Sequence, residues 1–207
     1  MKDFIMVVLI GYLFGMIQAS YLLGMWLYKV DVRKYGKGNA GASNATEAFG
    51  FKFGALVGVI DILKAFISLV LISYLYKANF RDSSSVLLYL NGLGVILGHN
   101  FPFYMGFKGG KGTASMVGMM WGLNPLFGLG SMVVMTVVSL VSDFIAIGTA
   151  AMLVYAVVVT MVFSESTISL VIMICLSAMS LYLHRQNFIR IRRREESRVS
   201  KVLRIKK

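Results

Sequence analysis

Acidic residues, cysteine, proline and histidine are all scarce in this chain of 207 residues. It contains nine Asp and Glu, one Cys, two Pro and two His, and only 14% of its residues are charged. The lone Cys175 cannot form an internal disulfide, and the Cys and His residues do not have a metal-binding spacing. So few charged residues cannot cover a soluble globule with polar surface. We therefore expect no metal, no cofactor and no soluble globular fold.

Long apolar stretches, by contrast, are abundant. Hydrophobic residues make up 57% of the sequence, and apolar runs of this length are typical of helices that cross a membrane. We expect seven such helices, at residues 4–28, 51–76, 85–97, 113–123, 126–141, 144–163 and 167–183. The prediction is an all-α polytopic membrane protein that forms a single domain over residues 1–207, with a short basic tail at 184–207.

The positive charge of the chain is concentrated at its C-terminal end. The formal net charge is +12, and residues 184–207 carry ten Lys or Arg against two Glu, which is +8 of that total. A basic tail after the last membrane helix is typical of the cytoplasmic face and can contact anionic lipid. With seven spans the N-terminus is then outside, and the loops at 29–50 and 98–112 lie on the cytoplasmic side with the tail. Nucleic-acid binding is disfavoured, because no soluble domain would present the basic patch.

The segment at 98–112, GHNFPFYMGFKGGKG, is the most unusual part of the sequence. Its glycines let the main chain approach a ligand, and exposed N–H groups in such a loop can hold an anion. Its lysines add positive charge, and the helix expected directly after it would point its N-terminus at the same place. The candidate residues are Lys108, Gly109, Gly110, Lys111 and Gly112. Two interpretations stay open: a phosphate cradle, or a flexible turn whose lysines follow the positive-inside rule.

Other polar residues fall in the segments expected on the same side. In loop 29–50, the side chains of Asn39, Ser43 and Asn44 are suited to hydrogen bonds with the backbone or with a ligand. The two histidines, His99 and His184, lie in the glycine-rich segment and at the start of the tail. Each is either a site residue or an interfacial histidine bonded to the backbone.

Asp61 and Lys64 lie inside the predicted span at 51–76. They are three residues apart, so their side chains share one face of the helix. Ionisable residues at membrane depth are costly and normally face a partner or a wet cavity. We expect a structural ion pair that fixes helix packing rather than a direct chemical role.

Several motifs in the chain together resemble those of the bacterial acyl-phosphate:glycerol-3-phosphate acyltransferases, the PlsY family. The first is DVRKYGKGNAGASN at 31–44, followed by DILK at 61–64. The second is the whole glycine-rich segment at 98–112. The third is HRQN at 184–187, with Arg190 and Glu196 beyond it. The likeness covers essentially the whole chain.

The resemblance implies an enzyme of the bacterial cell membrane that moves a fatty acyl group from acyl-phosphate to the 1-hydroxyl of glycerol 3-phosphate. The product, lysophosphatidic acid, begins phospholipid synthesis. Acyl-phosphate is an activated mixed anhydride, so positioning and charge stabilisation can supply the rate without a covalent nucleophile. The implied partners are the two substrates, membrane lipid and the soluble enzyme that makes acyl-phosphate.

The resemblance also implies roles for individual residues. His184 and Asn187 would position the reacting groups, and Glu196 would be structural. The implied substrate-binding residues are Asn39, Ser43, Asn44, His99, Lys108, Gly109, Gly110, Lys111, Gly112 and Ser139.

Two positions depart from the family pattern in a way that bears on the substrate. Lys37 stands where the family has serine, and Glu47 where it has arginine; both family residues are thought to contact substrate phosphate. Because a glutamate repels a dianionic substrate, we hypothesise that Lys37 and Glu47 form a compensating ion pair at the acceptor pocket. Three interpretations follow: an active enzyme on the family's substrates, a relative with a different acceptor, or a non-catalytic lipid-binding or regulatory membrane protein.

Overall fold

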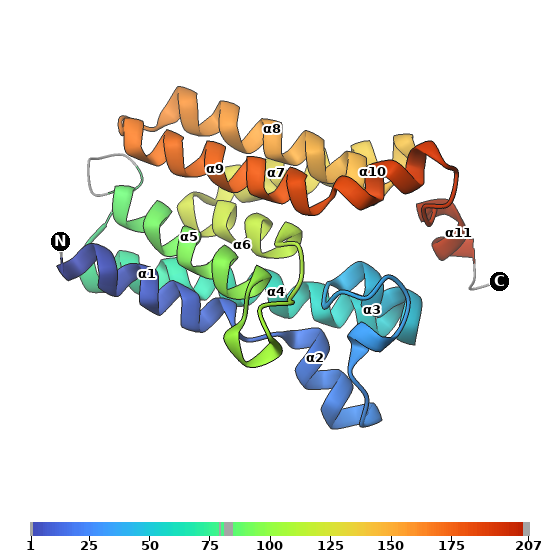
Figure 1. Cartoon of the computed structure of the whole chain (residues 1–207). Helices are drawn as coiled ribbons and strands as arrows, with labels where there is room; N and C mark the ends of the chain where they lie inside the picture. The colour runs from blue at the N-terminus through green and yellow to red at the C-terminus, as the bar shows by residue number, and fades with distance from the viewer. Residues whose placement is uncertain (1, 79, 81–84, 205–207) are drawn as a thin grey trace.

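The structure, a computed structural model, describes residues 2–78, 80 and 85–204, and this part of the chain is helical without a strand. The long helices run side by side, and the helix that begins at residue 2 starts at the end of the bundle opposite the helix at 199–204 (Figure 1). The elements are α1 (Lys2–Gly15), α2 (Ala19–Leu23), the π-helical η1 (Gly24–Tyr28), the 3₁₀ turn η2 (Val32–Lys34), α3 (Ala42–Phe49), α4 (Phe51–Tyr76), α5 (Ser85–Asn100), the 3₁₀ turn η3 (Phe103–Met105), α6 (Thr113–Leu123), α7 (Pro125–Ser142), α8 (Ile145–Phe163), α9 (Thr167–Leu183), α10 (Arg185–Arg192) and α11 (Val199–Arg204).

Local signals in the sequence account for several of these boundaries. Asn124 accepts a hydrogen bond from the amide of Leu126, and Pro125 takes the first helical position of α7, where its missing N–H costs nothing. Ser166 caps α9 in the same way. The predicted bounds of α4, α6 and α9 are confirmed to the residue, and those of α5, α7 and α8 to within three.

Two of the predicted spans differ in the structure from a straight helix of full membrane length. The first apolar stretch is broken after Gly15, and the side chain of Gln18 in the break donates to the carbonyl of His99 at 2.7 Å. Helix α6 has 11 residues, about 16 Å at 1.5 Å per residue, which is short of the ~30 Å hydrocarbon core. Within the described residues, five stretches are long and apolar enough to cross a membrane, or six if α9 and the bent α10 count as one.

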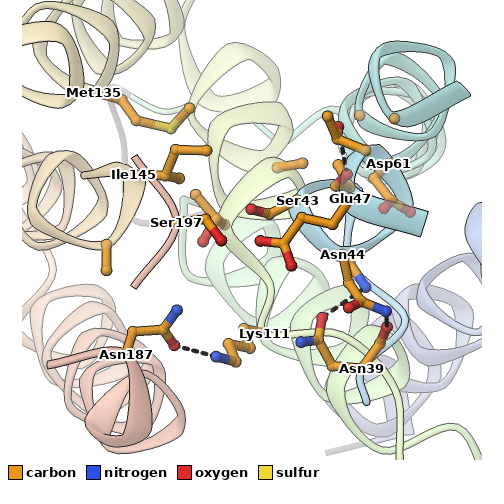
Figure 2. Close-up of a pocket in the computed structure, with 18 of the residues that line it drawn as sticks. Asn39, Ser43, Asn44, Glu47, Asp61, Lys111, Met135, Ile145, Asn187 and Ser197 are labelled. Carbon is orange, nitrogen blue, oxygen red and sulfur yellow. Dashed lines mark hydrogen bonds between the residues drawn. The ribbon is translucent and has the colours of Figure 1, made fainter. Parts of the chain in front are cut away.

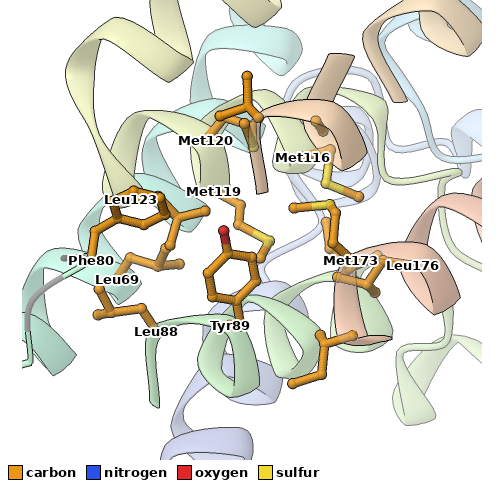
Figure 3. Close-up of a cluster of buried hydrophobic side chains, with 14 of the residues drawn as sticks. Leu69, Phe80, Leu88, Tyr89, Met116, Met119, Met120, Leu123, Met173 and Leu176 are labelled. Atoms are coloured by element: carbon orange, nitrogen blue, oxygen red, sulfur yellow. The ribbon is translucent and has the colours of Figure 1, made fainter. Parts of the chain in front are cut away.

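The helices pack in pairs around a central α5. Helix α1 lies along α5, α4 along α6, and α7 along α8. At Gly11 of α1 and Gly94 of α5 an added Cβ would clash with the facing backbone, so glycine permits the close approach of these two helices. The short α6 is held inside the bundle by a methionine-rich cluster around Tyr89 (Figure 3). Outward-facing apolar residues such as Leu126 and Val141 remain exposed, as expected of a lipid-facing surface.

Candidate functional site

A cavity of about 360 Å³ lies where α3, α4, α6 and α7 meet the C-terminal tail. Figure 2 shows side chains from these elements converging on it. The sequence-predicted residues that line it are Lys37, Asn39, Ser43, Asn44, Glu47, Asp61, His99, Lys111, Gly112, His184, Asn187 and Glu196. The three segments expected to share one side of the membrane therefore come together at one cavity.

Other sequence-predicted residues lie elsewhere. Lys108 is exposed in a separate surface hollow beside Arg33, and Lys64 is buried behind Asp61. Ser139 is buried between α7 and α8, against Gly148. Within the described part of the chain, none of Lys108, Lys64 and Ser139 belongs to the cavity lining.

The glycine-rich loop is built differently from the expected cradle. The amide of Gly109 donates to the carbonyl of Asn100 at 3.0 Å, and that of Gly110 to the carbonyl of His99 at 3.1 Å. These two N–H groups are therefore already used, which corrects the expectation that they are exposed donors. Glycine is needed at 110 because a Cβ there would clash with the imidazole ring of His99.

The donors that face the cavity belong instead to the start of α6. Gly112 takes φ +82° and caps the helix, and Gly112, Thr113 and Ala114 all line the cavity. The first N–H groups of a helix have no partner within it, and the helix dipole favours an anion there. This end of α6 is the part of the predicted phosphate cradle that the structure places at the cavity.

Lys111 lies beside this helix end and extends toward α10. Its ammonium group donates to the side-chain oxygen of Asn187, and the dashed line in Figure 2 marks this contact. Burial, with the nearby charge of Arg190, lowers the pKa of Lys111 to about 8. Because Asn187 is neutral, the charge of Lys111 is not cancelled by this partner and remains available to an anion.

Lys37 and Glu47 form the ion pair hypothesised from the sequence, with Lys37 Nζ 3.0 Å from Glu47 Oε1. Lys37 Nζ also lies 2.9 Å from Glu196 Oε1 and 2.9 Å from Ser197 Oγ. The ion pair is confirmed, but it is one part of a larger network that ties loop 29–50 to the C-terminal tail.

Glu196 is the hub of that network. Its carboxylate accepts from Asn187 at 2.9 Å and from Arg190 at 2.6 Å, in addition to Lys37. Burial alone would raise the pKa of Glu196, but the hydrogen bonds from Lys37, Arg190 and Asn187 outweigh it and hold that pKa below its usual value. Glu196 therefore stays ionised and keeps Asn187 in place for its contact with Lys111.

His184 is buried where α9 ends and α10 begins. Its Nδ1 lies 2.8 Å from the carbonyl oxygen of Ser180, and because a carbonyl only accepts, Nδ1 carries the proton in this arrangement. The neutral ring then presents Nε2 as an acceptor, on the side where Thr113 Oγ1 lies 3.5 Å away. His184 can thus accept a hydrogen bond from a hydroxyl group of a ligand in the cavity.

Asp61, Lys64 and His99 form a buried cluster behind the cavity. Lys64 Nζ lies 2.7 Å from Asp61 Oδ1 and 2.9 Å from His99 Nδ1, and it donates to the carbonyl of Ile17 at 2.7 Å. The expected Asp61–Lys64 ion pair is present. The further contacts of Lys64 with His99 and Ile17 tie α4 to α5 and to the break after α1. His99 reaches the cavity wall from this cluster.

The polar residues of loop 29–50 mainly serve the loop itself. Asn44 accepts from the amide of Lys37 at 2.6 Å and donates to the carbonyls of Val32, Tyr35 and Asn39. Asn39 accepts from the amide of Gly41 at 3.0 Å. The choice left open by the sequence, backbone or ligand, is thus settled for Asn44 in favour of the backbone, and these bonds fix the loop that carries Lys37.

Part of the cavity wall was missed by sequence reasoning. Beyond the predicted Glu196, the segment that joins α10 to α11, together with α11, covers the cavity with residues 197–199 and 202. It is fastened by Asp143, which accepts from the amide and hydroxyl of Ser200 at 2.7 and 2.9 Å. The basic composition of the tail indicated the cytoplasmic face and contact with anionic lipid, and no local pattern in it points to Asp143.

The remaining wall is apolar. Ile62 of α4, Val117 of α6, Met132 and Met135 of α7, and Ile145 of α8 line it. The cavity therefore joins a polar end with anion-binding groups to an apolar wall among the helices, which is the chemistry of a lipid phosphate or an acyl phosphate.

Comparisons with known proteins agree with this chemistry. A family model described as glycerol-3-phosphate acyltransferase matches residues 5–194. The chain is 36% identical over 197 residues to glycerol-3-phosphate acyltransferase 1 of Oceanobacillus iheyensis, with 93% of each chain covered. It is 31% identical over 202 residues to the glycerol-3-phosphate acyltransferase of Thermoanaerobacter pseudethanolicus, with 98% of each covered.

Solved structures give the same relationship. The chain superposes on a crystal structure of PlsY (YgiH), an integral membrane glycerol 3-phosphate acyltransferase, in its glycerol 3-phosphate form. The TM-score is 0.87 at 29% identity, with 99% of each chain covered. Against the lysophosphatidic acid form the TM-score is 0.82, with 97% of this chain and 98% of the other covered. With the family model matching most of its length, this chain belongs to the glycerol-3-phosphate acyltransferase family.

Proposed function

We propose that this protein transfers a fatty acyl group from acyl-phosphate to the 1-hydroxyl of glycerol 3-phosphate and releases lysophosphatidic acid and phosphate. The observation that carries the proposal is the cavity itself. It combines the charge of Lys111, the N-terminus of α6 and the acceptor nitrogen of His184 with an apolar wall. Its relatives in glycerol 3-phosphate and lysophosphatidic acid forms support the acceptor and the product.

The residues have distinct parts in this reaction. The acyl chain of the donor lies along the apolar wall, and its phosphate group binds Lys111 and the first N–H groups of α6. The 1-hydroxyl of the acceptor donates to His184 Nε2, which turns an oxygen lone pair toward the acyl carbonyl. The new ester C–O bond forms as the bond from the acyl carbon to the phosphate oxygen breaks. The hydroxyl proton passes to His184 Nε2 and from there to the departing phosphate, whose remaining charge is stabilised by Lys111.

The membrane arrangement is part of the proposal. We place the chain in the bacterial cell membrane as one integral-membrane unit with seven crossings, counting α6 as a short one, with the N-terminus outside. The cavity and the basic tail then face the cytoplasm, where glycerol 3-phosphate and a soluble acyl-phosphate-producing enzyme have access to it. The clustering of loops 29–50 and 98–112 with the tail at one cavity supports this orientation.

The decisive experiment is lysophosphatidic acid formation by purified protein supplied with acyl-phosphate and glycerol 3-phosphate. We expect turnover that needs both substrates and falls at least about 100-fold in His184→Ala, since positioning and hydrogen-bond acceptance contribute on this order. Glu165 is exposed in the connection between α8 and α9, at the end of the bundle opposite α11 (Figure 1). It gives the matched control Glu165→Gln, which should retain full activity. Absence of lysophosphatidic acid when both substrates are supplied would refute the proposal.

One observation favours a second candidate, a relative that uses a different acceptor. The positive charge of Lys37 is held between two carboxylates, Glu47 and Glu196, which reduces the charge that the cavity offers to a dianion. In the same assay, acylation of an uncharged glycerol derivative in preference to glycerol 3-phosphate would support this candidate.

A further inference from the structure

Lys37 is surrounded by three oxygen atoms. Glu47 Oε1 lies 3.0 Å from its Nζ, and Glu196 Oε1 and Ser197 Oγ each lie at 2.9 Å. An ammonium group has three N–H donors, so its contacts are satisfied before any substrate arrives. A phosphate oxygen can bind Lys37 closely only by replacing one of these three partners.

The three partners are not held equally. Glu196 is also bonded to Asn187 and Arg190, and Ser197 lies in the tail segment that Asp143 fastens through Ser200. Glu47 stands at the end of α3, and across the residues that the structure describes Lys37 is its sole ion-pair partner. Glu47 is therefore the partner most easily displaced, yet it stays close to whatever takes its place.

Lys37 and Lys111 serve different ends of the cavity. Lys111 lies two residues before α6, whose second turn places Val117 on the apolar wall, so a phosphate bound there can carry an acyl chain. Lys37 is in the loop that meets the tail, at the polar end, and suits the water-soluble acceptor. The chain of contacts from Lys111 through Asn187 and Glu196 to Lys37 joins the two positions.

We propose that Glu47 is a specificity-determining residue: through Lys37 it shifts the preference of the cavity away from an acceptor whose phosphate group carries two negative charges and toward one that carries a single negative charge. The inference rests on the proposed acyl transfer and deepens it by naming the charge form of the acceptor. Repulsion between the Glu47 carboxylate and a phosphate on Lys37 scales with the phosphate charge, so it is twice as large for a dianion.

The test compares two acceptors that differ by one charge. At pH 8, above its second pKa of about 6, glycerol 3-phosphate is a dianion, whereas its methyl phosphodiester is a monoanion. Each is measured with purified wild type and Glu47→Gln, as kcat/KM with acyl-phosphate and as binding of the acceptor alone by calorimetry. Glu195→Gln is the matched control, because Glu195 is exposed in the same tail and outside the set of described residues that line the cavity.

We expect Glu47→Gln to tighten the binding of glycerol 3-phosphate about 10-fold and that of the methyl phosphodiester about 3-fold. The repulsive free energy that the substitution removes is twice as large for the dianion as for the monoanion. Glu195→Gln should leave the binding of both acceptors unchanged. Equal effects on the two acceptors, no effect, or weaker binding of the dianion would overturn the inference. Glu47→Ser removes the same charge and replaces Glu47→Gln if the latter does not elute as a monodisperse protein.

The two proposals fail in different ways. If lysophosphatidic acid is formed but the preference between acceptors does not change, only the role of Glu47 is refuted. If no product forms but Glu47→Gln shifts acceptor binding as expected, the role of Glu47 in charge selectivity is supported and the proposed acyl transfer is refuted. Absence of both product and binding of either acceptor refutes both.

Discussion

Two lysines of the glycine-rich loop, three residues apart, lie in different surroundings. Lys111 lines the cavity, whereas Lys108 is exposed beside Arg33. A hydrogen bond to a charged group contributes about 1.5–3 kcal/mol, so Lys111→Ala should lower kcat/KM by roughly 10- to 150-fold. Lys108→Ala, which removes the same charge from the same loop, should stay within about twofold, the range of an exposed charge. Steady-state kinetics on both variants test this difference, and equal losses of kcat/KM would contradict the placement of Lys111 in the cavity and of Lys108 outside it.

Lys111 also predicts how activity depends on pH. Burial lowers the pKa of Lys111 to about 8, and only the protonated form attracts phosphate. Above the second pKa of the acceptor phosphate, about 6, the rate constant kcat/KM should therefore fall as the pH rises through 8, since kcat/KM reports groups of the free enzyme. Lys111→Arg keeps its proton at any accessible pH, so its profile should lose this decline. An unchanged decline in Lys111→Arg would assign it to another group.

The sequence predicted some of the residue-level contacts and not others. The ion pair of Lys37 with Glu47 followed from two opposite charges on a loop that had to fold back on itself. The use of the Gly109 and Gly110 amides did not follow, because it depends on how the loop returns to the end of α5. Whether an amide meets a ligand or a carbonyl is decided by that return path, which the local sequence leaves undetermined.

At the scale of elements, the tail segment over the cavity depends on Asp143 at the turn between α7 and α8. Asp143 takes φ +66°, a conformation that glycine adopts without strain, and its carboxylate bonds to Ser200. Asp143→Gly should keep the turn and lose the fastening, at a cost of about 1 kcal/mol, as for a lost helix cap. Amide hydrogen exchange of residues 195–204 should then speed up about fivefold.

The control for this experiment lies within the same molecule. Peptides from α4, which the tail does not fasten, should exchange at the wild-type rate in Asp143→Gly. Faster exchange throughout the bundle would mean general destabilisation, and unchanged exchange in the tail would mean that Asp143 does not hold it. Since residues 196–199 cover the cavity, a loosened tail should also raise KM for the acceptor.

The helices themselves were predictable where their signals are local. Asn124 and Pro125 begin α7, and apolar length alone defines α4. The break at Gln18 was missed because its cause is a hydrogen bond to His99, 81 residues away. Helix α11 was missed because it docks on Asp143, 57 residues away. Elements stabilised by such distant contacts carry no signature in their own sequence.

On the scale of the whole molecule, charge and apolar surface are separated. The chain begins at one end of the bundle, and the tail lies at the other, with α3 and the cavity (Figure 1). Apolar side chains of α1, α7 and α8 face outward between the ends. In the proposed reaction, the acyl chain would enter along the apolar wall from the membrane, and the phosphate of the acceptor would enter at the polar end from water. A reaction between a lipid donor and a water-soluble acceptor requires a site with both an apolar wall and a polar end.

The proposed orientation predicts which ends a reagent can reach in intact cells. In a Cys175→Ser background, which removes the exposed native thiol, single cysteines are placed at Lys108 and at Glu165. Both positions are exposed in the structure, and they stand on opposite sides of the membrane if the cavity end is cytoplasmic, as the positive-inside rule favours. A membrane-impermeant maleimide should label the cysteine at 165 in intact cells and the one at 108 only after permeabilisation. Labelling of 108 in intact cells, with 165 protected, would place the cavity outside and remove its access to cytoplasmic glycerol 3-phosphate.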